Sequence, residues 1–147
     1  MAEEDISLNL WQILKSLENL NDDSRWKAHK TKIVSLLSDY WDFHPHSAVE
    51  MLAVTATKCP FSILKSIVRE VVTNWRAKPT YSWAEGGSAD HCFLYALIVS
   101  DNADLVEPEL MAKCKGNMKY YAEDSRSKIT RDWLIKKNLL LRTMDIF

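Results

Sequence analysis

Basic residues are missing from the middle of this chain. Between Pro79 and Ala112 the sequence contains no lysine or arginine, although it carries six carboxylates. The six acidic residues are Glu85, Asp90, Asp101, Asp104, Glu107 and Glu109. The next segment, 113–142, has nine basic residues against three acidic ones, and residues 1–78 hold ten of each. The net charge of −1 therefore hides a strong asymmetry, which bears on partner choice and association rate rather than on fold.

Glycine and proline are also scarce, with three and four residues respectively. So few turn formers argue against a turn-rich β architecture and against long disordered tails. The length of 147 residues and the hydrophobic content of 47% are typical of one ordinary globular domain. A chain of this length buries roughly 70% of its unfolded surface, so it needs no disulfide or metal to hold it together. We therefore expect a single helical domain that covers residues 1–147.

Long apolar runs are absent, since none approaches the roughly 20 residues that a membrane-spanning helix needs. The first five residues include three acids, whereas a secretory signal starts with basic residues and continues into an apolar segment. The cysteines Cys59, Cys92 and Cys114 are odd in number and lie in apolar surroundings, which indicates reduced core thiols. These features predict a cytoplasmic protein without a membrane segment.

Helical periodicity runs through almost the whole sequence. Apolar residues recur at the spacing of one helix face, as between Leu10 and Leu20. Ser47 and Glu50 form a capping box that predicts a helix from Ala48 to about Lys58, and this helix is apolar nearly all round. About seven helices with short connections, and no strand-like alternation, predict an all-α fold. Two arrangements fit: a compact irregular helical bundle, or a short stack of helix pairs of the HEAT or armadillo kind.

The longest stretch without helical character is 79–87, and it contains Tyr81 and Trp83. Tyrosine and tryptophan often anchor protein interfaces, although a loop tryptophan can equally fold back onto the core. An exposed Trp83 would be surrounded by carboxylates, a pattern suited to a basic protein surface. We therefore predict a partner-binding site in this acidic region. Its residues are Tyr81, Trp83, Glu85, Asp90, Asp101, Asp104, Glu107 and Glu109.

The basic segment that follows offers a different site. Lys128, Arg131, Lys136 and Lys137 could follow the phosphates of a nucleic acid. No recognised nucleic-acid motif accompanies them, and the pI of about 6.4 argues against this class. The basic segment could also lie against the acidic one and neutralise it within the molecule. Nucleic-acid binding is therefore the second hypothesis.

Catalytic and metal-binding patterns are weak. Asp42, His44 and His46 would share one side of an extended segment and could hold a metal, but a loop with exposed histidines explains them as well. In the run Asp90-His91-Cys92, adjacent residues on a helix do not face one another, so the histidine is poorly placed to activate the thiol. Gly-rich phosphate loops, Cys-x-x-Cys pairs and nucleophile elbows are absent. We expect neither catalysis nor a cofactor.

The leading hypothesis is a non-catalytic protein-binding module that engages a basic partner through an acidic, aromatic-containing surface. One concrete version is an inhibitor or immunity-type protein that masks the cationic active site of a nuclease toxin. Carboxylates would steer the encounter, and an aromatic anchor would slow dissociation. The alternative is a nucleic-acid-binding helical domain that uses the basic C-terminal third.

Overall fold

The computed structural model describes residues 3–18, 23–81, 88–117 and 125–137. Within these ranges the backbone forms seven α-helices, one short 3₁₀ turn and no strand. The elements are α1 (Glu3–Leu17), α2 (Asp23–Phe43), α3 (Pro45–Lys58), α4 (Phe61–Arg76), α5 (Ser88–Val99), η1 (Ala103–Leu105), α6 (Pro108–Asn117) and α7 (Ser125–Lys136). The predicted all-α fold of about seven helices is confirmed.

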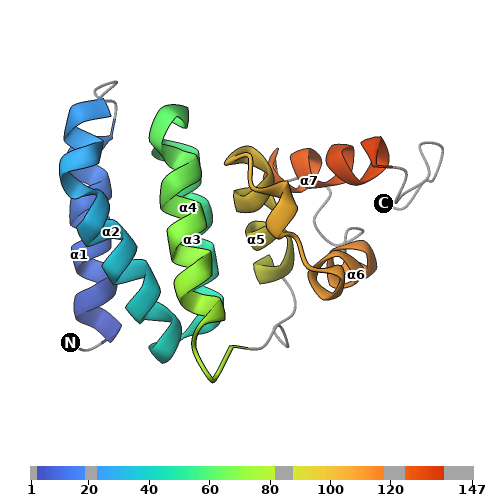
Figure 1. Ribbon diagram of the computed structural model, residues 1–147, viewed down its shortest axis with the longest axis horizontal. Coiled ribbons are helices and arrows are strands. Elements are labelled where there is room, and N and C mark those ends of the chain that lie inside the picture. Colours follow the sequence, from blue (N-terminus) through green and yellow to red (C-terminus); the bar gives the residue numbers. More distant parts are fainter. Residues whose placement is uncertain (1–2, 19–22, 82–87, 118–124, 138–147) are drawn as a thin grey trace.

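The helices form a compact bundle (Figure 1). The first four run alternately up and down. Helix α2 packs on α1, α3 and α4, and α5 packs on the other side of α3. Helices α6 and α7 then pack on α5. Short connections explain the alternating directions, because they turn the chain back at the end of each helix. Helix α4, however, packs mainly on α2 and only slightly on α3.

Helix α3 begins three residues earlier than the capping box predicts. Pro45 occupies the first turn, where its missing N–H costs nothing. The side chain that caps the helix belongs to His44, whose Nδ1 accepts a hydrogen bond of 3.1 Å from the backbone N–H of Ser47. Glu50 lies 2.8 Å from Nε2 of His46, one helical turn earlier. The sequence therefore indicated the correct helix but the wrong capping residue.

A line of aromatic side chains joins three helices in the core. The rings of Trp41 (α2) and Trp75 (α4) have centroids 5.0 Å apart, and Trp75 meets Phe93 (α5) edge to face at 5.9 Å. Trp75 is fully buried, and its Nε1 donates a hydrogen bond of 2.9 Å to the carbonyl oxygen of Leu37. Large rings buried in this way supply much of the apolar area that stabilises a small bundle.

The three cysteines are buried and unbridged, as the sequence predicts. Burial raises the pKa of Cys59 to about 12 and also raises that of Cys114. A raised pKa keeps these thiols protonated and unreactive at neutral pH. In the part of the chain that the structure describes, none of the helices combines the length and the apolar character required to cross a bilayer.

Candidate protein-binding face

The structure separates the residues of the predicted acidic site. Trp83 and Glu85 lie outside the described residues. Asp90 is fully buried in the first turn of α5, because α5 is enclosed by α3, α6 and α7, so this carboxylate is not available at a surface. Four acidic residues remain accessible along the connection from α5 to α6 and the first turn of α6. They are Asp101, Asp104, Glu107 and Glu109.

Tyr81 lies against the core rather than outside it. Its ring stacks on Trp41 with centroids 5.3 Å apart, and its hydroxyl donates a hydrogen bond of 2.9 Å to Oε1 of Glu107. Burial is the main reason why the pKa of Tyr81 rises to about 12, and the nearby carboxylate of Glu107 raises it further. Tyr81 therefore positions Glu107 and is not itself an exposed aromatic anchor.

We call residues 101–109 the acidic ridge. A buried amide fixes this segment: Asn102 is fully enclosed, and its Nδ2 donates to Oγ of Ser100 at 2.8 Å and to the carbonyl oxygen of Lys65 at 3.2 Å. Its Oδ1 accepts a hydrogen bond of 3.1 Å from Arg69. Asp101 has a φ of 61°, the left-handed conformation that aspartate tolerates better than most residues. The ridge is thus tied to α4 at its start.

Three carboxylates of the acidic ridge form ion pairs with α4. Lys65 lies 3.2 Å from Asp101, and Arg76 lies 2.7 Å from Glu107. Arg69 meets both oxygens of Asp104, at 3.2 Å and 3.0 Å. The acids recur every third residue along the ridge, and the bases Lys65, Arg69 and Arg76 share one face of α4 because they are four and seven residues apart.

This pairing differs from the internal neutralisation that the charge pattern suggested. In the part of the chain that the structure describes, the bases that pair with Asp101, Asp104 and Glu107 come from α4, in the balanced first half of the chain. Much of the basic segment 113–142 lies outside the described residues. In the sequence, the spacing of Lys65, Arg69 and Arg76 indicates that these three bases share one side of a helix, beside its apolar face. This spacing was the available sign of a basic stripe that could pair with carboxylates. Their partners lie about thirty to thirty-six positions away in sequence, and only the folded arrangement of the helices reveals them.

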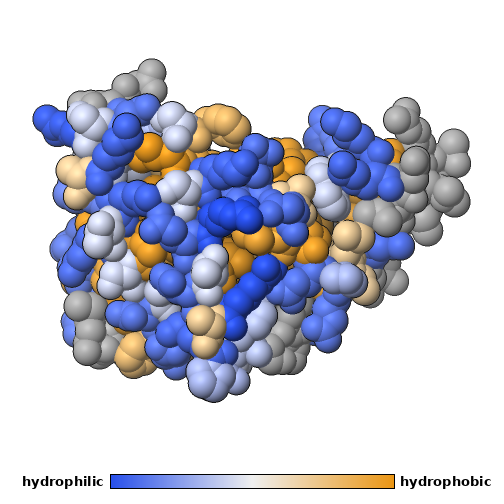
Figure 2. Space-filling model, viewed as in Figure 1, coloured by the Kyte–Doolittle hydropathy of each residue, from blue (hydrophilic) through white to orange (hydrophobic). Residues whose placement is uncertain are grey.

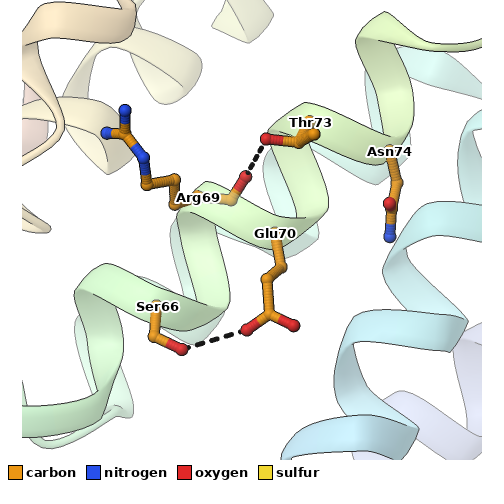
Figure 3. A pocket seen from close by; sticks show the side chains of 5 residues that line it. All are labelled: Ser66, Arg69, Glu70, Thr73 and Asn74. Carbon is orange, nitrogen blue, oxygen red and sulfur yellow. Dashed lines mark hydrogen bonds between the residues drawn. The ribbon is translucent and has the colours of Figure 1, made fainter.

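On its other side α4 borders α2 across a polar groove. This groove is lined by Lys30, Thr31, Val34, Ser35, Ser38 and Asp39 from α2, by Glu70 and Asn74 from α4, and by Lys78 just beyond α4. A second hollow, which shares Glu70 and Asn74, is lined by α4 alone and also includes Ser66, Arg69 and Thr73. Figure 3 shows Asn74 directed toward α2, while Arg69 points the opposite way. Nδ2 of Asn74 donates to Oγ of Ser38 at 2.9 Å. Lys30 lies 2.6 Å from Glu70 across the groove, and its hydrogen bond is the main reason why the pKa of Glu70 is lowered.

We call the surface formed by α2, α4 and the acidic ridge the α2–α4 face. Figure 2 shows it as largely hydrophilic. In four of its ion pairs the acidic side chain is the more exposed member, whereas Arg76 and Glu107 are about equally exposed. The exposed fractions are 69% for Asp101 against 52% for Lys65, and 52% for Glu70 against 32% for Lys30. Asp104 is likewise more exposed than Arg69, and Asp42 is more exposed than Lys78.

Hydrogen bonds to a basic side chain lower the pKa of two of these carboxylates, Asp104 and Glu70. Hydrogen bonding to Arg69 lowers the pKa of Asp104, and the pKa of Arg69 is raised in turn. Both shifts favour the charged forms of the pair. On the α2–α4 face the acids are therefore at least as exposed as their basic partners, and most of them are already paired.

The other sequence candidates occupy different positions. Asp42 pairs with Lys78 at 2.9 Å, while His44 caps α3 and His46 contacts Glu50, so the three do not converge on one point. Among the residues that the structure describes, no group of three or more His, Cys, Asp or Glu side chains could hold a metal.

The run Asp90-His91-Cys92 is buried in α5. Lys128 and Lys136 on α7, and Lys137 just after it, are exposed, and Arg131 is half-exposed. Nζ of Lys137 lies 6.0 Å from the centre of the Trp133 ring. No known protein family, curated protein or solved structure matches this chain.

Proposed function

We propose that this protein is a non-catalytic binding module that engages a basic protein partner through the α2–α4 face. The observation that carries the proposal is that the carboxylate is the more exposed member in four ion pairs of this face, those of Glu70, Asp101, Asp104 and Asp42. The contact residues are Asp101, Asp104, Glu107 and Glu109 of the acidic ridge, supported by Glu70. Trp83 and Glu85 adjoin Tyr81 in sequence and remain part of the proposed contact set.

The ion pairs within the α2–α4 face determine how a basic partner would bind to it. Exposed salt bridges contribute about 0–1 kcal/mol each, so a basic partner can replace a lysine or arginine of α4 at small cost. The same pairs weaken the long-range field, because each carboxylate is partly cancelled by a neighbour. Recognition by this face therefore depends on close contact more than on attraction at a distance. A protein that covers a cationic active site, such as that of a nuclease toxin, is one form of this function.

Binding to a basic probe protein tests the proposal. Lysozyme and cytochrome c serve as probes in calorimetric titrations at low and at near-physiological salt. The double variant Asp101→Asn with Asp104→Asn removes two ridge charges and keeps a residue at position 101 that tolerates the left-handed conformation. Its affinity should fall about three- to tenfold.

The matched control removes two exposed carboxylates elsewhere, through Asp5→Asn on α1 and Asp132→Asn on α7. Both double variants change the net charge by the same amount, so a position-independent charge effect would weaken them equally. Equal weakening, or no binding of either probe by the unaltered protein at low salt, would rule out the acidic-face proposal.

The exposed lysines of α7 support a second candidate, nucleic-acid binding through the basic C-terminal third. Lys128, Lys136 and Lys137 project from a helix whose Trp133 is only partly buried. Retention on immobilised DNA and RNA should then fall steeply with salt, and should be lost when these lysines and Arg131 are changed to glutamine. Retention that is insensitive to these changes would exclude this candidate.

A further inference from the structure

We infer that this protein forms a homodimer through the exposed side of α1, with the helices of the two copies packed antiparallel. We define the α1 stripe as Asp5, Leu8, Trp11 and Lys15, which occupy this side at spacings of three and four residues. The stripe faces away from the rest of the bundle, so a dimer leaves the α2–α4 face available to a partner. Dimerisation is therefore independent of the proposed function.

Two large apolar side chains are exposed side by side on α1. Leu8 is 58% exposed and Trp11, one helical turn later, is 47% exposed. The other exposed large apolar residues in the described ranges, Phe43, Phe61 and Ile129, belong to three different helices. Single apolar residues at a surface are ordinary, whereas neighbouring ones that include a tryptophan are typical of a contact surface.

Helix α1 does not need this stripe for its own packing. Its inner side carries four buried residues at the spacing of one helix face: Ile6, Leu10, Leu14 and Leu17. This inner side packs mainly on α2, and Figure 1 shows both helices at one end of the molecule. Leu8 and Trp11 therefore form a second apolar surface, which the described part of the chain does not cover.

The charges on the stripe stand at its two ends. Asp5 lies one turn before Leu8, and Lys15 lies one turn after Trp11. Both charged side chains are exposed. Glu18, which follows Lys15 by three residues, is already paired with Lys58 at 2.7 Å. Along the helix, the stripe therefore has an acid, two apolar residues and a base, an order that is complementary to its own reverse.

The charged pair and the apolar pair share one centre. The midpoint between Asp5 and Lys15 falls at Leu10, and the midpoint between Leu8 and Trp11 falls within one residue of it. A two-fold axis through this point would place Leu8 of each copy against Trp11 of the other. The same rotation would place each Asp5 against the Lys15 of the other copy.

The positions around the helix agree with this arrangement. At about 100° per residue, Asp5 and Lys15 fall on opposite sides of Leu8, and a two-fold rotation exchanges the sides of the stripe as well as its ends. A purely basic, acidic or apolar partner would match only part of the stripe. Two-fold dimers require a surface that is complementary to itself, so the stripe identifies a second copy of this chain as its occupant.

Sedimentation equilibrium of the full chain at low salt, from micromolar to millimolar concentrations, tests the inference. One pair of short helices is expected to bury less than the roughly 1,200–2,000 Å² of a standard interface, so the dimer should be weak and depend on concentration. Trp11→Ala should weaken self-association about tenfold. Phe61→Ala is the control, since it removes a side chain that is 68% exposed at the start of α4, and it should have no effect.

Two charge variants test the antiparallel arrangement. Asp5→Lys and Lys15→Asp should each self-associate about three- to tenfold more weakly, because like charges then meet at both ends of the helix pair. An equimolar mixture of the two variants should recover association, because each charge then faces an opposite one. Asp132→Lys and Lys136→Asp make the same charge changes at exposed positions of α7, and each should associate like the unaltered protein.

Circular dichroism confirms that each variant is folded. A protein that stays monomeric over the whole concentration range would overturn the inference. Self-association that Trp11→Ala leaves unchanged would overturn it too, because another surface would then form the dimer. A mixture that fails to recover association, or an equal loss in the α7 variants, would show that Asp5 and Lys15 do not face each other.

Discussion

Trp75 and Leu37 are joined by a buried hydrogen bond from the indole Nε1 to the backbone carbonyl oxygen, with a length of 2.9 Å. The bond crosses the interface between α4 and α2 at the centre of the aromatic line. Trp75→Phe keeps a ring but removes the donor and part of the buried area. We expect this change to lower the free energy of unfolding by about 1–3 kcal/mol, as measured by urea denaturation. A change below about 0.5 kcal/mol, the range of ordinary surface substitutions, would contradict this role.

Asn102 should be the most sensitive position of the acidic ridge. Its buried amide bonds to Ser100, to Arg69 and to the carbonyl oxygen of Lys65. Asn102→Ala leaves buried polar groups without their partner and should cost about 1–3 kcal/mol of stability. Glu109→Ala, on the exposed end of the same segment, is the control and should cost little. Thermal and urea unfolding of both variants provide the comparison, and equal stabilities would argue against an anchoring role for the amide.

The positive φ of Asp101 leads to an ordered series of substitutions at one position. Asp101→Asn should be close to neutral for stability, because asparagine tolerates the left-handed region. Asp101→Gly should also be tolerated, since glycine adopts this conformation without steric strain. Asp101→Val should be less stable than Asp101→Asn by about 1–2 kcal/mol. Urea midpoints measured in one buffer test the order, and a valine variant as stable as the asparagine variant would refute it.

The pKa of Tyr81 predicts how stability changes at high pH. Its value in the folded protein is about 12, compared with an ordinary value of 10.0, so the folded state holds this proton more tightly. The resulting stabilisation is complete below about pH 10 and is lost as the pH rises toward 12. We expect the unaltered protein to lose about 1–2 kcal/mol more than Tyr81→Phe across this interval. Parallel pH profiles for the two proteins would show that Tyr81 does not contribute in this way.

Local sequence patterns predicted the helices because helix faces depend on short-range spacing. The apolar stripe of α4, from Leu64 to Trp75, is an example, and its buried face agrees with the pattern. The start of α3 was misplaced because a histidine nitrogen performs the capping, whereas the sequence rule looks for serine with a glutamate three residues later. Helix boundaries depend on such single contacts, which makes them harder to predict than the presence of a helix.

The candidate site was predictable only in part. The carboxylates of the acidic ridge are visible in the sequence, and several of them are exposed. Their pairing with α4 and the stacking of Tyr81 on Trp41 are contacts between distant parts of the chain, for which the sequence gives no spacing rule. Asp90 shows the opposite case, since an acid within an apolar segment followed its helix into the interior. The burial and the partners of these residues were therefore determined by tertiary contacts rather than by residue type.

The acidic ridge has a mechanical consequence for the bundle. Helix α5 and the elements after it are joined to the first four helices in two ways: by buried contacts and by the ion pairs between the ridge and α4. The buried contacts are the packing of α5 on α3, the contact of Trp75 with Phe93, and the hydrogen bonds of Asn102 to α4. Salt screens the second connection and leaves the first intact. A ligand that competes for the ridge carboxylates would act on the same connection. The two parts of the molecule are therefore held together by buried contacts that salt does not weaken and by surface ion pairs that salt does weaken. Binding at the surface acts directly on the ion pairs.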